Sequence, residues 1–356
     1  MALEHLGTPQ APTFGLDTFG DRGTRPDGRQ VSHAEAIRQV VAEGQLADEL
    51  GLDFFGVGEH HRDDFAVSAP EVVLAALAGR TSRIRLGTSV TVLSSDDPVR
   101  VFERFSTLDA LSRGRAEVTL GRGSFTESFP LFGLRLEDYE QLFSEKLDLF
   151  AEVLKEQPVT WTGSLRPPLE KQPVYPPTES GRLPAWIGVG GTPQSVVRAA
   201  HYGFPLVIAV IGGSPAQFVP LADLYRQALA EFGQDPLPIS MHSPGHVAET
   251  DELAVEQMFP HQRDAFTKIG RERGWAPYTR EAFDAMTGPT GALFVGSPET
   301  VAQKIAWAVR TLGLARFQLK YSVGTQPNAE RLSSIRLYGE RVVPRVRELL
   351  AGAPPA

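Results

Sequence analysis

The 356-residue sequence contains no cysteine. Disulfide bonds, thiolate nucleophiles and cysteine-ligated metal sites are therefore excluded. The sequence also has no basic excess, because 35 lysines and arginines stand against 43 aspartates and glutamates, giving a net charge of −8. Proteins that bind nucleic acid or an acidic membrane surface need basic side chains to neutralise phosphates, so we expect neither partner.

Long apolar runs are absent as well. No stretch approaches the roughly 18 consecutive apolar residues that a membrane-spanning helix needs. The first residues, Met1–Ala11, lack the basic region and apolar core of a signal peptide. The expected compartment is therefore the cytoplasm. Hydrophobic residues make up 42% of the chain, which is enough for the core of an ordinary globular protein.

Short apolar segments of strand character alternate with helical patterns along the chain. Ser32 and Glu35 form a capping box at the first helix, and Pro70 and Pro98 occupy first-turn positions of later helices. Strands are predicted over residues 13–17, 54–58, 84–93, 116–120, 185–189, 206–210, 238–242 and 316–321. Eight strands alternating with helices predict a parallel sheet closed into a TIM barrel, the (β/α)₈ fold.

Two segments depart from this alternation. Residues 243–315 separate the seventh and eighth strands, which predicts an insertion that ends in an amphipathic helix over 298–312. Residues 158–184 are rich in proline and are predicted to form a long surface loop or lid. The whole chain, residues 1–356, is interpreted as one barrel domain with its core at about 13–345.

The second strand ends in Glu59-His60-His61-Arg62. Active sites of TIM barrels lie at the carboxyl ends of the strands, although a polar loop is also what commonly follows any buried strand. His60 and His61 are adjacent, so on an extended chain they point to opposite faces and do not chelate one ion. No His-Glu-x-x-His occurs, and the first strand ends in Leu16-Asp17-Thr18 instead of His-x-His. We expect no catalytic metal.

A glycine-rich segment follows the fifth strand. Residues 187–193 read Ile-Gly-Val-Gly-Gly-Thr-Pro, which lacks the last glycine and the downstream acid of a dinucleotide fingerprint. A phosphate site remains possible in this pattern. Gly190 and Gly191 let the backbone approach an anion, the helix start offers free N–H groups, and Thr192 and Ser195 add hydroxyls. The alternative is a plain turn into a helix capped by Thr192.

Two further strand ends carry candidate binding residues. Arg122 lies between Gly121 and Gly123 after the fourth strand and suits a phosphate or carboxylate; the alternative is a salt-bridged loop arginine. Gly212, in Ile211-Gly212-Gly213 after the sixth strand, would let a flat ligand pack on bare backbone.

Several segments, taken in order, resemble the bacterial luciferase-like flavin-dependent monooxygenases. No single motif is specific, and the resemblance depends on the order and spacing of the motifs. It covers most of residues 13–345 and is clearest over 50–125. The matching segments are residues 59–61 (Glu-His-His), 69–70, 84–93, 97–100, 108–115, 121–123, 184–188 and 203–206.

The resemblance implies a flavoprotein oxidoreductase in which reduced FMN and O₂ oxidise a small organic substrate. It implies a separate flavin reductase as partner, a homodimeric assembly, and His60 as the catalytic histidine acting in proton transfer. The FMN phosphate is placed near Arg122, Thr192 and Ser195. The ring is placed over the third strand, where the family has a non-proline cis peptide that by position is Ser89–Val90.

Two positions depart from luciferase itself. Gly121 stands where luciferase has a cysteine beside the flavin, and Gly191 where it has an acid, so light emission is not implied. Asp17 and residues 211–213 and 158–184 are expected to flank the substrate pocket. Two alternatives stay open. One is hydride transfer with the deazaflavin F420 on the same fold, and the other is a flavin-binding or storage protein without turnover.

Overall fold

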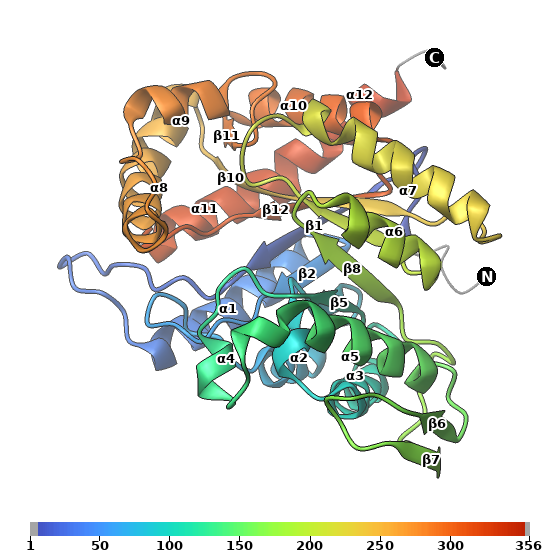
Figure 1. The fold of residues 1–356 in the computed structure, drawn as a ribbon. Helices are drawn as coiled ribbons and strands as arrows, with labels where there is room; N and C mark the ends of the chain where they lie inside the picture. The colour runs from blue at the N-terminus through green and yellow to red at the C-terminus, as the bar shows by residue number, and fades with distance from the viewer. Residues whose placement is uncertain (1–5, 353–356) are drawn as a thin grey trace.

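The computed structural model describes residues 6–352 as parallel strands that alternate with helices (Figure 1). The strands are β1 (Thr13–Thr18), β2 (Phe54–Val57), β3 (Arg85–Thr88), β4 (Thr91–Val92), β5 (Val118–Gly121), β6 (Val159–Trp161), β7 (Leu169–Gln172), β8 (Ala185–Val189), β9 (Leu206–Ala209), β10 (Ile239–Val247), β11 (Phe294–Gly296) and β12 (Arg316–Lys320). The α-helices are α1 (His33–Glu49), α2 (Pro70–Ala78), α3 (Pro98–Ser112), α4 (Ser128–Leu131), α5 (Tyr139–Val153), α6 (Pro193–His201), α7 (Val219–Glu231), α8 (Asp251–Arg273), α9 (Arg280–Thr287), α10 (Pro298–Leu312), α11 (Asn328–Leu337) and α12 (Val343–Ala351).

The main sheet closes on itself as a barrel. Its strand order is β3-β2-β1-β12-β10-β9-β8-β5-β4, and every pairing in it is parallel. The two outermost strands, β3 and β4, are consecutive in the chain, and a parallel bridge between Leu86 and Ala116 joins β3 to the segment before β5. Counting β3 and β4 as one interrupted strand gives the eight strands of a TIM barrel, so the predicted fold is confirmed.

The third barrel strand differs from its prediction as one continuous segment. It is interrupted between β3 and β4, and the peptide bond between Ser89 and Val90 at the interruption is cis. This bond is the one at which the family resemblance places a cis peptide.

The outer face of the barrel is apolar because helices cover it. Phe14, Leu16, Phe55 and Val57 are all fully buried in the main core cluster together with helical residues such as Leu74. Strands covered on both sides are expected to be almost continuously hydrophobic, and β2 is buried at every position. The apolar packing between strands and helices therefore lies on the outer face of the barrel, and polar residues occupy much of its interior.

A network of charged and polar side chains fills the amino-terminal half of the barrel interior. Glu117 accepts hydrogen bonds from Arg316 Nη1 and Trp186 Nε1, each at 2.8 Å, and also pairs with Arg85. Burial by itself would raise the pKa of Glu117, but Arg316 and Arg85 lower this pKa to about 2. Because these partners satisfy the carboxylate, the closed end of the barrel is a packed ionic layer.

The predicted insertion between the seventh and eighth strands is confirmed and comprises α8, α9 and β11. Lys304, from α10, ties it to the barrel by donating to the carbonyl oxygens of Gly288 and Leu293, each at 2.6 Å. The seventh strand itself was predicted too short, because β10 runs on through Pro244 to Val247. Past His242 the strand separates from β9 and pairs with β11 of the insertion. The backbone groups of the additional residues of β10 find hydrogen-bond partners there.

Of the two forms predicted for residues 158–184, a surface loop or a lid, the structure shows a surface segment that contains a short antiparallel hairpin of β6 and β7. Trp161 of this hairpin donates to Asp148 on α5 at 2.8 Å. The hairpin follows α5 and precedes β8, and Figure 1 shows it beside α5 and far from the α8–α9 insertion. It packs along the outside of α5, and its Arg166 pairs at 2.8 Å with Asp97, the N-cap of α3. Within residues 6–352 no helix is long and apolar enough to cross a membrane.

Candidate active site at the carboxyl ends of the barrel strands

His60 follows β2 and lies among aromatic rings. Its ring centroid is 4.5 Å from that of Phe19, 4.6 Å from Phe65 and 5.2 Å from Phe125. These rings come from the loops after β1, β2 and β5. Among residues 6–352 no side-chain hydrogen bond engages the imidazole nitrogens, so His60 is free to meet a ligand.

Its surroundings keep His60 uncharged. Burial lowers the pKa of His60 to about 3, and the nearby carboxylate of Asp21 only partly opposes this effect. The ring is therefore uncharged at neutral pH in the protein without ligand. A neutral imidazole can still donate one hydrogen bond and accept another, which suits it to hold a polar group of a ligand.

Glu59 and His61, on either side of His60, have structural roles. One carboxylate oxygen of Glu59 accepts from the backbone N–H of Val92 at 2.8 Å, and the other lies 2.8 Å from His61 Nε2. Glu59 thus ties the loop after β2 to β4. Of the two adjacent histidines, only His60 remains available for chemistry.

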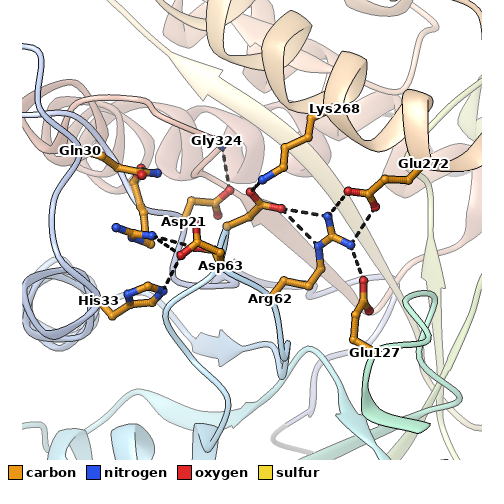
Figure 2. Close-up of polar contacts among 11 residues, drawn as sticks. Asp21, Gln30, His33, Arg62, Asp63, Glu127, Lys268, Glu272 and Gly324 are labelled. Carbon is orange, nitrogen blue, oxygen red and sulfur yellow. Dashed lines mark hydrogen bonds and ion pairs between the residues drawn. The ribbon is translucent and has the colours of Figure 1, made fainter. Parts of the chain in front are cut away.

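Arg62 also has a structural role, because it connects the loop after β2 to the insertion (Figure 2). Its guanidinium bonds Asp64 at 3.0 Å and Glu272 of α8 at 2.7 Å, and it also pairs with Glu127 just before α4. These carboxylates raise the pKa of Arg62 and keep it charged. Lys268, also from α8, pairs with Asp64 on the same loop.

The insertion, and not the 158–184 hairpin, covers the His60 side of the barrel mouth. Arg273 of α8 donates to the carbonyl oxygen of Ser124 at 2.8 Å. Its guanidinium lies 4.9 Å from the ring of Phe125, and that of Arg62 lies 4.7 Å from the same ring. Since Phe125 contacts His60, α8 and the loop after β5 together close over the histidine.

The Ser89–Val90 peptide is surrounded by strand positions that have no room for a side chain. A Cβ atom on Gly58 would lie 2.6 Å from the carbonyl oxygen of Ser89, and one on Gly121 would lie 2.5 Å from a methyl group of Val90. Gly121, where luciferase has a cysteine, is therefore required here by the Val90 side chain. Ser89 and Val90 are only partly buried, and the Ser89 hydroxyl lies 3.3 Å from the side-chain oxygen of Gln318 on β12.

The structure brings the predicted phosphate-binding residues together. Arg122 Nη2 lies 3.4 Å from Thr192 Oγ1, which is 2.7 Å from Ser195 Oγ. Thr192 is the N-cap of α6, as the alternative of a capped turn requires, but its side chain makes no capping hydrogen bond and its hydroxyl lies against Ser195 and Arg122 instead. Arg122 also pairs with Glu140, so the salt bridge proposed as an alternative is present beside the contact to Thr192.

Two residues of this cluster were missed in the sequence. Glu140, in the first turn of α5, pairs with both Arg122 and Arg198, and Arg198 Nη1 is buried without a partner among the described residues. Two guanidinium groups against one carboxylate leave a positive charge beside the start of α6. The i,i+3 spacing of Ser195 and Arg198 on one helix was the available signal, whereas nothing in the sequence links Glu140 to them.

The glycines predicted to approach a ligand face open space. A Cβ atom on Gly190 or Gly212 would meet no atom within 4 Å, and one on Gly191 would meet only the Phe218 ring, at 3.9 Å. Their backbone is therefore accessible to a ligand held by Arg122 and Thr192. Among residues 6–352, no three histidine or acidic side chains converge as metal ligands would.

A second histidine at the barrel mouth was also missed. His242 of β10 is nearly buried, and its Nδ1 lies 2.8 Å from Oδ2 of the fully buried Asp17 of β1. Phe19 stacks on the His242 ring with a centroid distance of 6.1 Å, so the same phenyl ring contacts both His60 and His242. Asp17, expected only to flank a pocket, is thus one half of an acid–histidine pair.

Comparison with known protein families agrees with this arrangement. The family model described as luciferase-like monooxygenase matches residues 14–316. The chain belongs to this family. The alkanal monooxygenase alpha chain of Photobacterium leiognathi is 24% identical over 341 residues, covering 89% of this chain and 95% of its own. The N-acetyl-S-alkylcysteine monooxygenase of Bacillus subtilis (strain 168) is 26% identical over 333 residues, covering 88% and 96%.

Solved structures of similar fold include members with either of two cofactors. The monooxygenase RslO1 from Streptomyces bottropensis superimposes with a TM-score of 0.80 at 23% identity, covering 93% of this chain and 99% of its own. The oxygenating constituent of 3,6-diketocamphane monooxygenase from Pseudomonas putida, solved with FMN, gives 0.73 at 19%, covering 94% and 99%. An F420-dependent secondary alcohol dehydrogenase, solved with an F420–acetone adduct, gives 0.71 at 17%, also covering 94% and 99%. At these identities the superpositions show the fold.

Proposed function

We propose that the protein is a monooxygenase that uses reduced FMN, delivered by a separate reductase, and O₂ to oxidise a small organic substrate. The observation that carries the proposal is the cluster of Arg122, Thr192 and Ser195 at the same barrel end as His60, whose ring is kept uncharged by burial. Family membership makes a monooxygenase or related oxidoreductase the expected class of enzyme. We propose further that it works as a homodimer, on the family resemblance.

The residues present fit a flavin phosphate. Arg122, Thr192 and Ser195 offer a guanidinium and two hydroxyl groups beside the start of α6, where Pro193 has no N–H and the Ser195 N–H already bonds the Thr192 carbonyl oxygen. The unpartnered Nη1 of Arg198 is a further donor that a phosphate oxygen would satisfy. Gly190, Gly191 and Gly212 would let the rest of the cofactor lie close to the backbone, and Ser89 and Val90 would line its ring.

When bound, reduced FMN would supply the electrons that activate O₂. His60 would hold a polar atom near the ring through its neutral imidazole, since the aromatic side chains around it disfavour the imidazolium. Phe65, Phe125 and α8 would exclude water from this side of the site. Exclusion of water strengthens each polar contact made there.

The phosphate assignment is tested by titrating two flavins against three proteins. Arg122→Ala should weaken FMN binding roughly 10- to 150-fold, because a charge-assisted hydrogen bond is worth about 1.5–3 kcal/mol. Riboflavin lacks the phosphate, so its affinity should change little. Arg135→Ala is the matched control, since Arg135 is exposed and pairs only with Glu137. Equal weakening of both flavins by Arg122→Ala would mean that Arg122 supports the loop and does not read the phosphate.

Hydride transfer with the deazaflavin F420 is a second candidate, because an F420-dependent enzyme shares the fold at a TM-score of 0.71. Titrating the purified protein with FMN and with F420, and recording the visible spectrum, separates the two cofactors. Oxygen uptake with reduced flavin separates a monooxygenase from a flavin-binding protein without turnover. Preferential binding of F420 without oxygen uptake would overturn the first proposal.

A further inference from the structure

The acid–histidine pair of Asp17 and His242 is not needed to hold FMN, and it is built into the wall of the barrel mouth. The two residues lie on β1 and β10, which are separated in the sheet only by β12. Gly56 of β2 pairs with Asp17 in register, and a Cβ atom on it would lie 2.6 Å from Ser89 Oγ and 3.1 Å from Asp17 Cβ. Asp17 is therefore close to the peptide proposed to line the cofactor ring.

The contact to Asp17 fixes the role of each imidazole nitrogen of His242. The Asp17 carboxylate, 2.8 Å from Nδ1, accepts a hydrogen bond from the N–H of that nitrogen. In the neutral ring the other nitrogen, Nε2, then carries a lone pair. No hydrogen bond engages Nε2 among residues 6–352, and Phe19 holds the plane of the ring by stacking at 17°. His242 thus presents an oriented proton acceptor.

The second oxygen of Asp17 distinguishes this pair from a purely structural ion pair. Asp17 is fully buried, yet its Oδ1 has no partner among the described residues. Two structural acids, Glu117 and Glu43, differ in this respect, whereas the buried Asp109 of α3 also has one oxygen without a partner among the described residues. Glu117 uses both oxygens, toward Arg316, and Glu43 uses both, toward Tyr321 and Arg331. A buried carboxylate oxygen is costly to leave unpaired, so Asp17 Oδ1 indicates a place for a donor group of a ligand.

We propose that His242, oriented by Asp17, is the proton acceptor for the organic substrate and that this substrate carries a hydroxyl group. The hydroxyl proton passes to Nε2, which leaves a substrate oxyanion beside an imidazolium; no electrons are transferred in this step. Asp17 acts as a positioning residue and stabilises the positive charge that forms on the ring. His60 has no such carboxylate partner, so the two histidines have different tasks. The inference deepens the proposed function, because it assigns the substrate class of the same site.

The test compares ligands that differ only in the hydroxyl hydrogen. Calorimetry would measure binding of para-nitrophenol and cyclohexanol, each against its methyl ether, to the FMN-loaded protein at a pH where both hydroxyls are protonated. The wild type should prefer each hydroxyl compound about 10-fold or more, because a site that hydrogen-bonds a hydroxyl rejects the analogue without it. Asp17→Asn should abolish the preference, since an amide N–H facing Nδ1 moves the ring hydrogen to Nε2.

His242→Gln provides a second variant, should Asp17→Asn fail to fold, and it should also reduce the preference. Ser243→Ala is the matched control. Ser243 is next to His242 on β10, but its hydroxyl donates outward to the carbonyl oxygens of Val210 and Ala292. This control should lower the melting temperature and leave the preference unchanged.

Three results would overturn the inference. Asp17→Asn and His242→Gln could keep the preference, which would make the pair structural. They could instead weaken FMN binding alone, which would assign the pair to the cofactor. The wild type could also bind neither hydroxyl compound, which would exclude the substrate class. The proposed function is judged separately, by FMN titration and by oxygen uptake with reduced flavin.

Discussion

His60 and His242 lie at the same end of the barrel but differ in the side chains that surround them. His60 has aromatic rings around it and no carboxylate partner, whereas His242 has Asp17 at 2.8 Å. Burial among aromatic rings disfavours a charged imidazole at His60, whereas the carboxylate beside His242 orients its ring. Position at a strand end brings both residues to the site, and contacts with other strands give them different surroundings.

For His60, substitution by alanine should preserve the fold and the affinity for FMN while lowering turnover. Loss of a positioned proton-transfer or hydrogen-bonding group typically costs about 10²–10⁴-fold in rate. Steady-state oxygen uptake and product formation, with FMN titration and circular dichroism as controls, would measure this effect. A variant that turns over at the wild-type rate would remove His60 from the mechanism, and one that does not fold would assign it to the core.

The protonation of His60 can be measured directly. Its pKa is lowered from 6.5 to about 3, so the folded protein does not take up a proton on this ring as the pH falls through 6.5, whereas the unfolded chain does. This difference reduces stability progressively as the pH falls from about 6.5 toward 3. NMR titration of the ring in the ligand-free protein should give a midpoint far below 6.5; a midpoint near that value would contradict the account of its surroundings.

At the scale of the elements, the insertion between β10 and β12 is what closes the site. Helix α8 meets the loop after β2 through Arg62 and Lys268, and meets the loop after β5 through Arg273 (Figure 2 shows the first two). The insertion follows a strand at its carboxyl end, and in a TIM barrel segments in this position lie over the active site. The 158–184 hairpin precedes β8 and packs on the outside of α5, with Arg166 reaching Asp97 after β4.

Arg62→Ala should loosen this cover. Removal of a guanidinium that is only 10% exposed leaves Glu127 and Glu272 without their shared partner, which should cost about 1–3 kcal/mol. Hydrogen exchange should become faster in α8 and in residues 122–131. Lys268→Ala is the control, because Lys268 is 53% exposed and its pair with Asp64 should contribute less than about 1 kcal/mol. Equal effects of the two variants would show that Arg62 is an ordinary surface residue.

At the scale of the whole molecule, the barrel separates its charges into two layers. Glu117 and Arg316 form a fully buried pair in the amino-terminal half, while Asp17 and His242 lie nearer the carboxyl ends of β1 and β10. The first layer is fully paired by protein groups, whereas the second leaves Asp17 Oδ1 unpaired among the described residues. The same interior thus provides stability at one end and chemistry at the other.

Glu117→Gln should destabilise the fold by about 3–5 kcal/mol, because it leaves Arg316 and Arg85 buried without a countercharge. The pKa of Glu117 is lowered from 4.5 to about 2, so its contribution is complete above about 4.5 and is lost as the pH falls toward 2. Urea denaturation should show the difference from wild type shrinking across that window. Glu299→Gln, in an exposed pair with Arg345, should change stability by less than about 1 kcal/mol at any of these pH values.

The sequence by itself determined the fold, the position of the insertion and most strand ends. Apolar segments spaced by helices encode a barrel whichever residues line it, and residues after a strand end must lie at its mouth. His60, Arg122 and Thr192 were found in this way. The proline content of residues 158–184 was a poor guide to their position. It indicates a surface segment but does not tell whether that segment covers the active site.

Only the tertiary structure decided which strand-end residues work together. The pair of Asp17 and His242 joins residues 225 positions apart, and the ring of contacts around Arg122 depends on Glu140 from a helix that carries no motif. The pKa of His60 likewise depends on rings contributed by three separate loops. Local sequence patterns encode backbone periodicity, whereas charge pairing and burial arise from side chains that meet only when the barrel closes.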